Sequence, residues 1–180
     1  HQSDLFRHLS SSFDVLIGID TNTKTIGSEI LSVSGIVHCV ITKSDPNSYH
    51  ADFPWHGAIL FRNCPPELHP EKFGWITEIK RINSNPQNRQ IRFAIITDHD
   101  LDNHIPYNKK QKPIYSNFYL PDNFQLLYGR GDGSNESLLT YLVKQCDQKS
   151  TDIIKEISDK GYYQHEGKNF TIDQIPIPKL

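Results

Sequence analysis

Two short apolar runs, each ended by an aspartate, constrain the fold of this chain most. Residues 15–19 lead into Asp20 and residues 93–97 lead into Asp98, and a polar turn sequence follows each aspartate. Runs of about five β-branched and aromatic residues between turn-forming residues are typical of buried strands in parallel or mixed sheets. A carboxylate at the end of such a strand is costly to bury unless a cation or a reacting group faces it. The pattern predicts two strands whose ends carry either site residues or the first residues of turns.

Length and composition indicate one ordinary globular domain. The chain has 180 residues, of which 36% are hydrophobic and 22% charged. We expect an N-terminal arm over residues 1–12, a single α/β domain over 13–158 and a C-terminal tail over 159–180 that packs on the domain or extends from it. The formal net charge of −2 argues against a wholly basic nucleic-acid surface but leaves room for a local basic groove.

Cysteine usage and hydropathy bear on the compartment. The three cysteines, Cys39, Cys64 and Cys146, are odd in number and lack disulfide-framework spacing, which favours a reducing compartment and predicts a cytoplasmic protein. No run approaches the ~20 apolar residues of a membrane span, so no membrane partner is expected.

The order of periodic segments predicts a mixed five-stranded sheet with flanking helices. Helical spacing of apolar residues begins at Pro70 and stops before residues 83–86, and a second amphipathic helix is expected from about Ser134 to residue 158. Residues 99–123 form a long loop, which is usually functional or mobile. The expected strands are 13–20, 30–42 with a bend at Gly35, 57–62, 91–98 and 124–128.

This order, with its acidic positions, resembles the ribonuclease H-like superfamily across residues 13–158. Members place one Asp in the first strand, a Glu in the first helix, an Asp at the end of the fourth strand and a further acid in the last helix. The matching residues are Asp20 in Ile-Asp-Thr, Glu78 in Trp-Ile-Thr-Glu-Ile and Asp98 in Ile-Thr-Asp-His. The resemblance implies a metal-dependent nuclease or related phosphoryl-transfer hydrolase.

Two-metal phosphoryl transfer explains why such enzymes need clustered carboxylates. Oxygen ligands from separate elements hold two Mg²⁺ or Mn²⁺ ions about 4 Å apart, which activate water and stabilise the leaving oxygen. Asp20, Glu78 and Asp98 are the expected ligands, with Glu71, one heptad before Glu78, as the rival helix acid. His99 is the expected proton-transfer group, because imidazole titrates near neutral pH.

The fourth acid departs from the superfamily pattern. Three residues beyond Glu136, where an Asp is expected, the chain has Leu139. We assign Glu136 as the fourth metal ligand, with Asp132 and Asp147 as alternatives. Acids that open a helix are equally explained by the free amides and dipole of its first turn, which applies to Asp132 and Glu136.

The alternative function is a non-catalytic binding module that keeps the fold and recognises nucleic acid or protein through the 99–123 loop. Aromatic rings beside lysines can stack bases next to phosphates, although packing of the rings on the sheet is the plainer explanation. The missing acid at Leu139 favours the module, and the two aspartates at strand ends favour the enzyme. The residues concerned are Tyr107, Lys109, Lys110, Lys112, Tyr115, Phe118, Tyr119 and Phe124.

Overall fold

The computed structural model describes residues 2–46, 48–98, 113–129 and 137–179. It is an α/β fold built on a mixed five-stranded sheet with the strand order β3-β2-β1-β4-β5. The predicted fold class is therefore confirmed, and the topology is compatible with a ribonuclease H-like arrangement. In chain order the elements are α1 (Gln2–Ser12), β1 (Val15–Ile26), β2 (Glu29–Asp45), β3 (Ser48–Arg62), α2 (Pro70–Asn83), the 3₁₀ turn η1 (Pro86–Gln90), β4 (Phe93–Asp98), β5 (Phe124–Gly129), α3 (Leu138–Lys160), β6 (Tyr162–His165), β7 (Lys168–Thr171) and the 3₁₀ turn η3 (Ile172–Gln174).

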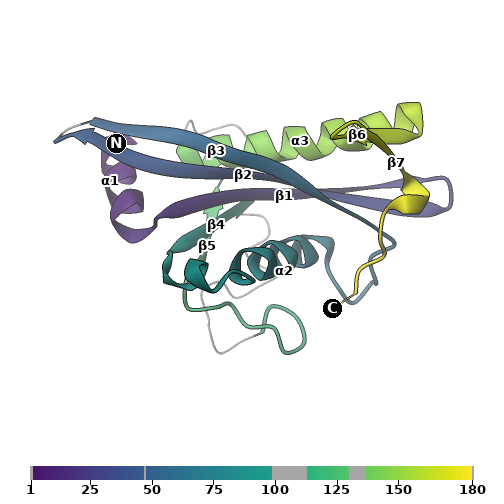
Figure 1. Ribbon diagram of the computed structural model, residues 1–180, viewed down its shortest axis with the longest axis horizontal. Helices are drawn as coiled ribbons and strands as arrows, with labels where there is room; N and C mark the ends of the chain where they lie inside the picture. The colour runs from purple at the N-terminus through teal and green to yellow at the C-terminus, as the bar shows by residue number, and fades with distance from the viewer. Residues whose placement is uncertain (1, 47, 99–112, 130–136, 180) are drawn as a thin grey trace.

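The sheet separates two helical layers (Figure 1). Strand β1 pairs antiparallel with β2 and parallel with β4, which pairs parallel with β5. Side chains alternate between the faces. Ile17 and Ile19 pack with α2 residues such as Ile76, whereas Leu16 packs with Leu142 of α3. Even-numbered residues in this part of β1 therefore point toward α3.

Strands β1 to β3 are longer than the sequence predicts. The sequence predicts a polar connection over residues 21–28, yet residues 21–26 continue β1 opposite β2. On the α2 face of this half of the hairpin, hydroxyl pairs replace apolar contacts. Thr21 Oγ1 lies 2.6 Å from Ser34 Oγ, and Thr23 Oγ1 lies 2.8 Å from Ser32 Oγ. A hydrophobicity pattern misses a strand that is held in this way.

Helix α3 lies unusually close to the sheet because two glycines face it. A Cβ added to Gly35 would lie 2.3 Å from the Cys146 carbonyl oxygen, and one added to Gly18 would lie 3.0 Å from Cys146 Sγ. Gly35 does not end or break β2, which runs from Glu29 to Asp45. Its missing side chain instead admits the backbone of α3.

A bulge interrupts the edge strand β3. His38 pairs with Trp55 and Val40 with Asp52, so Phe53 and Pro54 together face Cys39. The extra residue lets two nearby aromatic side chains reach opposite faces of the sheet. Phe53 contacts Tyr141 of α3, and Trp55 contacts Arg81 of α2.

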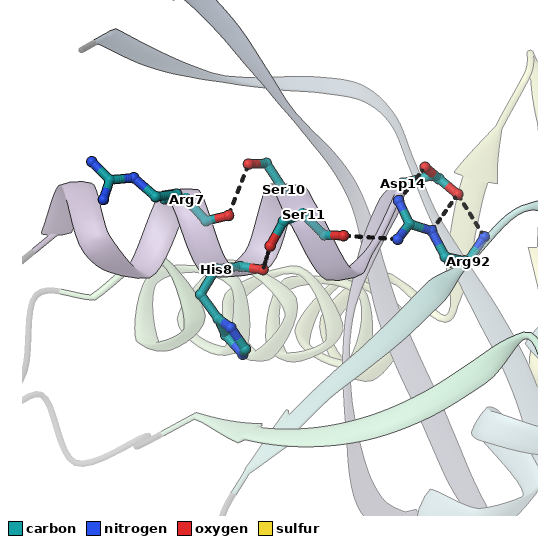
Figure 2. A network of polar contacts seen from close by, with 6 residues as sticks. All are labelled: Arg7, His8, Ser10, Ser11, Asp14 and Arg92. Atoms are coloured by element: carbon teal, nitrogen blue, oxygen red, sulfur yellow. Dashed lines mark hydrogen bonds and ion pairs between the residues drawn. The ribbon is translucent and has the colours of Figure 1, made fainter. Parts of the chain in front are cut away.

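Helix α1 is joined to the start of the sheet by a polar network (Figure 2). The Arg92 guanidinium donates to Asp14 Oδ1 at 3.0 Å and, through its other Nη, to the Ser11 carbonyl at 2.8 Å. Asp14 precedes β1 and Arg92 precedes β4, so the contact fixes the starts of two neighbouring parallel strands. Leu9 and Phe13 of the same region pack in the core beneath α3.

The chain ends in a small hairpin and an extended tail. Strands β6 and β7 pair through a tight turn in which Glu166 and Gly167 have positive φ angles of 50° and 77°. The tail returns to β3, where the backbone N–H of Arg62 donates to the Pro176 carbonyl at 3.0 Å. Among the helices of the described residues, none combines the length and the apolar character that crossing a membrane requires.

Candidate functional site around Asp20 and Asp98

Asp20 and Asp98 lie on neighbouring parallel strands. Asp98 is the last residue of β4, as predicted, whereas Asp20 does not end its strand, because β1 continues to Ile26. Gly18 of β1 is in register with Ile96 of β4, and the two aspartates follow two residues further along each strand. Residues in register on neighbouring parallel strands point to the same face. Because Gly18 faces α3, both aspartates belong to the α3 face.

Helix α3 adds a third carboxylate, Asp147. Asn22 of β1 donates from Nδ2 to Asp147 Oδ1 at 2.8 Å and also to the Ser150 hydroxyl. Asn22 follows Asp20 by two residues and so lies on the same face. It therefore holds the Asp147 side chain beside β1.

The surroundings of Asp20 strongly favour its protonated form. Burial is the main cause, followed by a hydrogen bond between Asp20 and Asp147, and together with the negative charges of Asp147, Asp98 and Glu71 they raise the pKa of Asp20 to about 8. Two carboxyl groups can share such a hydrogen bond only when one of them carries a proton. Three acids from three other elements, Asp147 of α3, Asp98 of β4 and Glu71 of α2, thus act on Asp20.

The sequence predicts Glu78 as the acid from the first helix, with Glu71 as its rival. Glu71 lies in the first turn of α2, and its negative charge helps to raise the pKa of Asp20. The Glu71 carboxylate also accepts a hydrogen bond from His69. Glu78 lies two turns later on the same helix.

The Glu78 carboxylate is fully engaged elsewhere. Its side chain is 0% exposed, with Oε2 at 3.0 Å from His38 Nε2, and Oε1 accepts a hydrogen bond from Arg81 Nε. Burial alone would raise the pKa of Glu78, but the hydrogen bonds from His38 and Arg81 and their charges outweigh it, so that the pKa is lowered. The Trp55 ring covers this ion pair, lying 4.7 Å from both the His38 ring centroid and the Arg81 guanidinium carbon. Glu78 has the setting of a structural ion pair.

The donor chemistry suits a hard divalent cation. Asp20 and Asp147 offer carboxylate oxygens, and Asn22 offers an amide oxygen. Oxygen atoms are the ligands that Mg²⁺ and Mn²⁺ prefer. Within residues 2–46, 48–98, 113–129 and 137–179, however, no three Asp, Glu, His or Cys side chains converge closely enough to hold one metal ion. The carboxylates are neighbours rather than a closed coordination sphere.

Some predicted site residues lie outside the described part of the chain. These are His99, the expected proton-transfer group, and Glu136, the expected fourth ligand, together with its alternative Asp132. Of the 99–123 loop, residues 113–123 are described. Tyr115 and Phe118 pack against the core on the α2 side, whereas Tyr119 is 48% exposed.

The sequence predicts Glu136 as the fourth ligand, with Asp147 only as one of its two alternatives, and it does not single out Asn22. The useful signal was the position of Asp147 directly after Cys146, at the edge of the apolar stripe of α3, where a side chain can reach a neighbouring strand.

Comparison of the chain with family models, with curated proteins and with solved structures finds no match in any of the three.

Proposed function

We propose that the protein is a metal-dependent nuclease or related phosphoryl-transfer hydrolase of the ribonuclease H-like type. Asp20, Asp98 and Asp147 would supply the main ligands for Mg²⁺ or Mn²⁺, and Glu71 would replace Glu78 as the acid from the first helix. A bound cation would have to draw these carboxylates together, because no three acids converge among the described residues. The observation that carries the proposal is the register that aligns Asp20 with Asp98 on neighbouring parallel strands, next to the Asp147 carboxylate held by Asn22.

Each residue has a distinct role in this proposal. When bound, the cation supplies Lewis-acid activation of water and of the phosphodiester. To hold a cation, Asp20 would release to solvent the proton that it shares with Asp147, because a carboxylate binds metal in its deprotonated form. Asn22 keeps the Asp147 carboxylate oriented toward Asp20 of β1. His99, which follows Asp98 in the chain, is assigned proton transfer.

The test is Mn²⁺-dependent cleavage of a panel of single- and double-stranded DNA and RNA by the intact chain. We expect Asp98→Asn to lower the rate at least about 100-fold while leaving the fold intact, since the isosteric amide removes charge but keeps volume. The matched control is Asp152→Asn, because Asp152 also lies on α3 but accepts a hydrogen bond from Gln148. It should keep the wild-type rate.

Metal binding is measured separately by thermal unfolding. A ligand that binds only the folded state raises Tm by mass action, so Mn²⁺ should raise the Tm of the wild type more than that of Asp20→Asn. Equal shifts in the two proteins, or equal cleavage by wild type and Asp98→Asn, would contradict the assignment of these ligands.

The second candidate is the non-catalytic binding module. It is favoured by the finding that no three acids converge among the described residues. In that case the folded wild type cleaves no substrate in the panel, even at millimolar Mn²⁺, and Tyr119→Ala weakens nucleic-acid or protein binding because this ring is exposed on the loop.

A further inference from the structure

A cavity of about 350 Å³ lies between the edge strand β3, helix α3, the β6–β7 hairpin and the C-terminal tail. Strand β3, the β6–β7 hairpin and the C-terminal tail contribute apolar side chains to its wall, among them Leu60, Tyr163, Phe170 and Ile175. Its volume is within the range of pockets that hold small organic ligands, about 300–1,000 Å³.

One lysine side chain, that of Lys149, belongs to this otherwise largely apolar wall. Lys149 of α3 lines the cavity beside His56, and its Nζ donates to His56 Nδ1 at 3.1 Å. A ring nitrogen that accepts this bond is unprotonated and leaves the ammonium charge uncompensated. No carboxylate in the described residues forms an ion pair with Lys149 within 4.0 Å.

We propose that this cavity binds a small organic carboxylate with an apolar body, its anionic group on Lys149 and its body against Leu60, Tyr163 and Phe170. Two physical arguments favour an apolar carboxylate over a neutral apolar ligand and over a polyanion. A neutral apolar ligand would cover a lysine charge without pairing it, which is costly. A polyanion such as nucleic acid needs several cations along its backbone, and this cavity offers a single lysine.

The cavity is separate from the carboxylates around Asp20 and Asp98. Asp147, two residues before Lys149, accepts a hydrogen bond from Asn22 of β1, whereas Lys149 contacts His56 of β3. Binding of a carboxylate in this cavity can therefore be tested independently of the nuclease activity.

The experiment is a titration of the full chain with octanoate by isothermal calorimetry, with 1-octanol as the uncharged probe of similar length. We expect saturable binding of one octanoate with a Kd below about 1 mM, which corresponds to about −4 kcal/mol. Octanol should bind at least about tenfold more weakly, because it lacks the charge that pairs with Lys149. Lys149→Gln should weaken octanoate binding to the level of octanol.

Three further variants test the positive charge, the apolar wall and the specificity of the lysine separately. Lys155→Gln is the matched control, since Lys155 is an exposed lysine of the same helix and should leave octanoate binding unchanged. Phe170→Ser should weaken both probes because it removes apolar wall, and Lys149→Arg should retain octanoate binding. Absence of octanoate binding to the wild type, equal affinity for octanol, or unchanged binding in a folded Lys149→Gln variant would overturn the proposal.

Discussion

At the scale of single residues, Glu78 shows how a buried acid can be structural rather than catalytic. His38 and Arg81 hold both of its oxygens. Removing one partner of such a buried pair commonly costs about 3–5 kcal/mol, because the remaining charges stay desolvated. We predict that Glu78→Gln lowers the free energy of unfolding by about 3 kcal/mol at pH 7, measured by chemical denaturation.

The pH dependence of this effect has a definite sign. Because the folded protein lowers the pKa of Glu78 below its ordinary value of 4.5, the ion pair stabilises the fold fully above that value and loses its contribution as the pH falls through the folded pKa. The stability difference between Glu78→Gln and the wild type should therefore shrink in acid. Glu67→Gln, at an exposed position, should change stability by less than about 0.5 kcal/mol. A pH-independent difference at Glu78 would contradict the ion-pair account.

At the scale of elements, the packing of α3 depends on Gly35. The Cys146 carbonyl oxygen belongs to the helix backbone, so a methyl group at Gly35 cannot be accommodated by a side-chain rotation. We predict that Gly35→Ala destabilises the fold by about 3 kcal/mol, at the upper end of overpacking costs. The measurement is the midpoint of denaturant unfolding.

Gly57→Ala is the matched control for this prediction. A methyl group at Gly57 meets only the Trp55 ring, which is a side chain 40% exposed at the sheet edge and can move. It should cost about 1 kcal/mol or less. Similar losses in the two variants would mean that the close approach of α3 is not the cause.

The elements also show which parts of the fold follow from local sequence. Strand β4 and helix α2 were predicted within a few residues, because apolar runs and the proline and asparagine signals at Pro70 and Asn83 mark them. The extended parts of β1 and β2 were missed, since Thr21 and Ser34 pair through hydroxyls rather than through apolar area. Local periodicity measures apolar burial and does not detect cross-strand hydrogen bonding.

At the scale of the whole molecule, the candidate site depends on placements that no local pattern encodes. Asp20 and Asp98 were found because an apolar run leads into each, although only Asp98 ends its strand and β1 continues past Asp20 to Ile26. Glu71 and Glu78 lie on nearly one line of α2, so only the position of the helix along the sheet decides between them. Asp147 was identified through Asn22, across 125 residues of sequence, which required the tertiary packing of α3 on β1.

The bulge in β3 has a consequence for association between molecules. An edge strand of 15 residues offers unpaired backbone groups on which a second chain can add its own strand. Pro54 has no N–H to donate, and the bulge at Phe53 and Pro54 twists the edge locally. The same irregularity that sends Phe53 and Trp55 to opposite faces therefore prevents an uninterrupted ladder between copies.

Replacing this proline should make the protein aggregate. We predict that Pro54→Val increases concentration-dependent light scattering at neutral pH, whereas Pro66→Val, at an exposed proline outside the strands, does not. If both variants stay as monodisperse as the wild type, the edge is protected by other means. A single missing hydrogen-bond donor, at Pro54, thus limits how far the strand of another molecule can pair along the β3 edge.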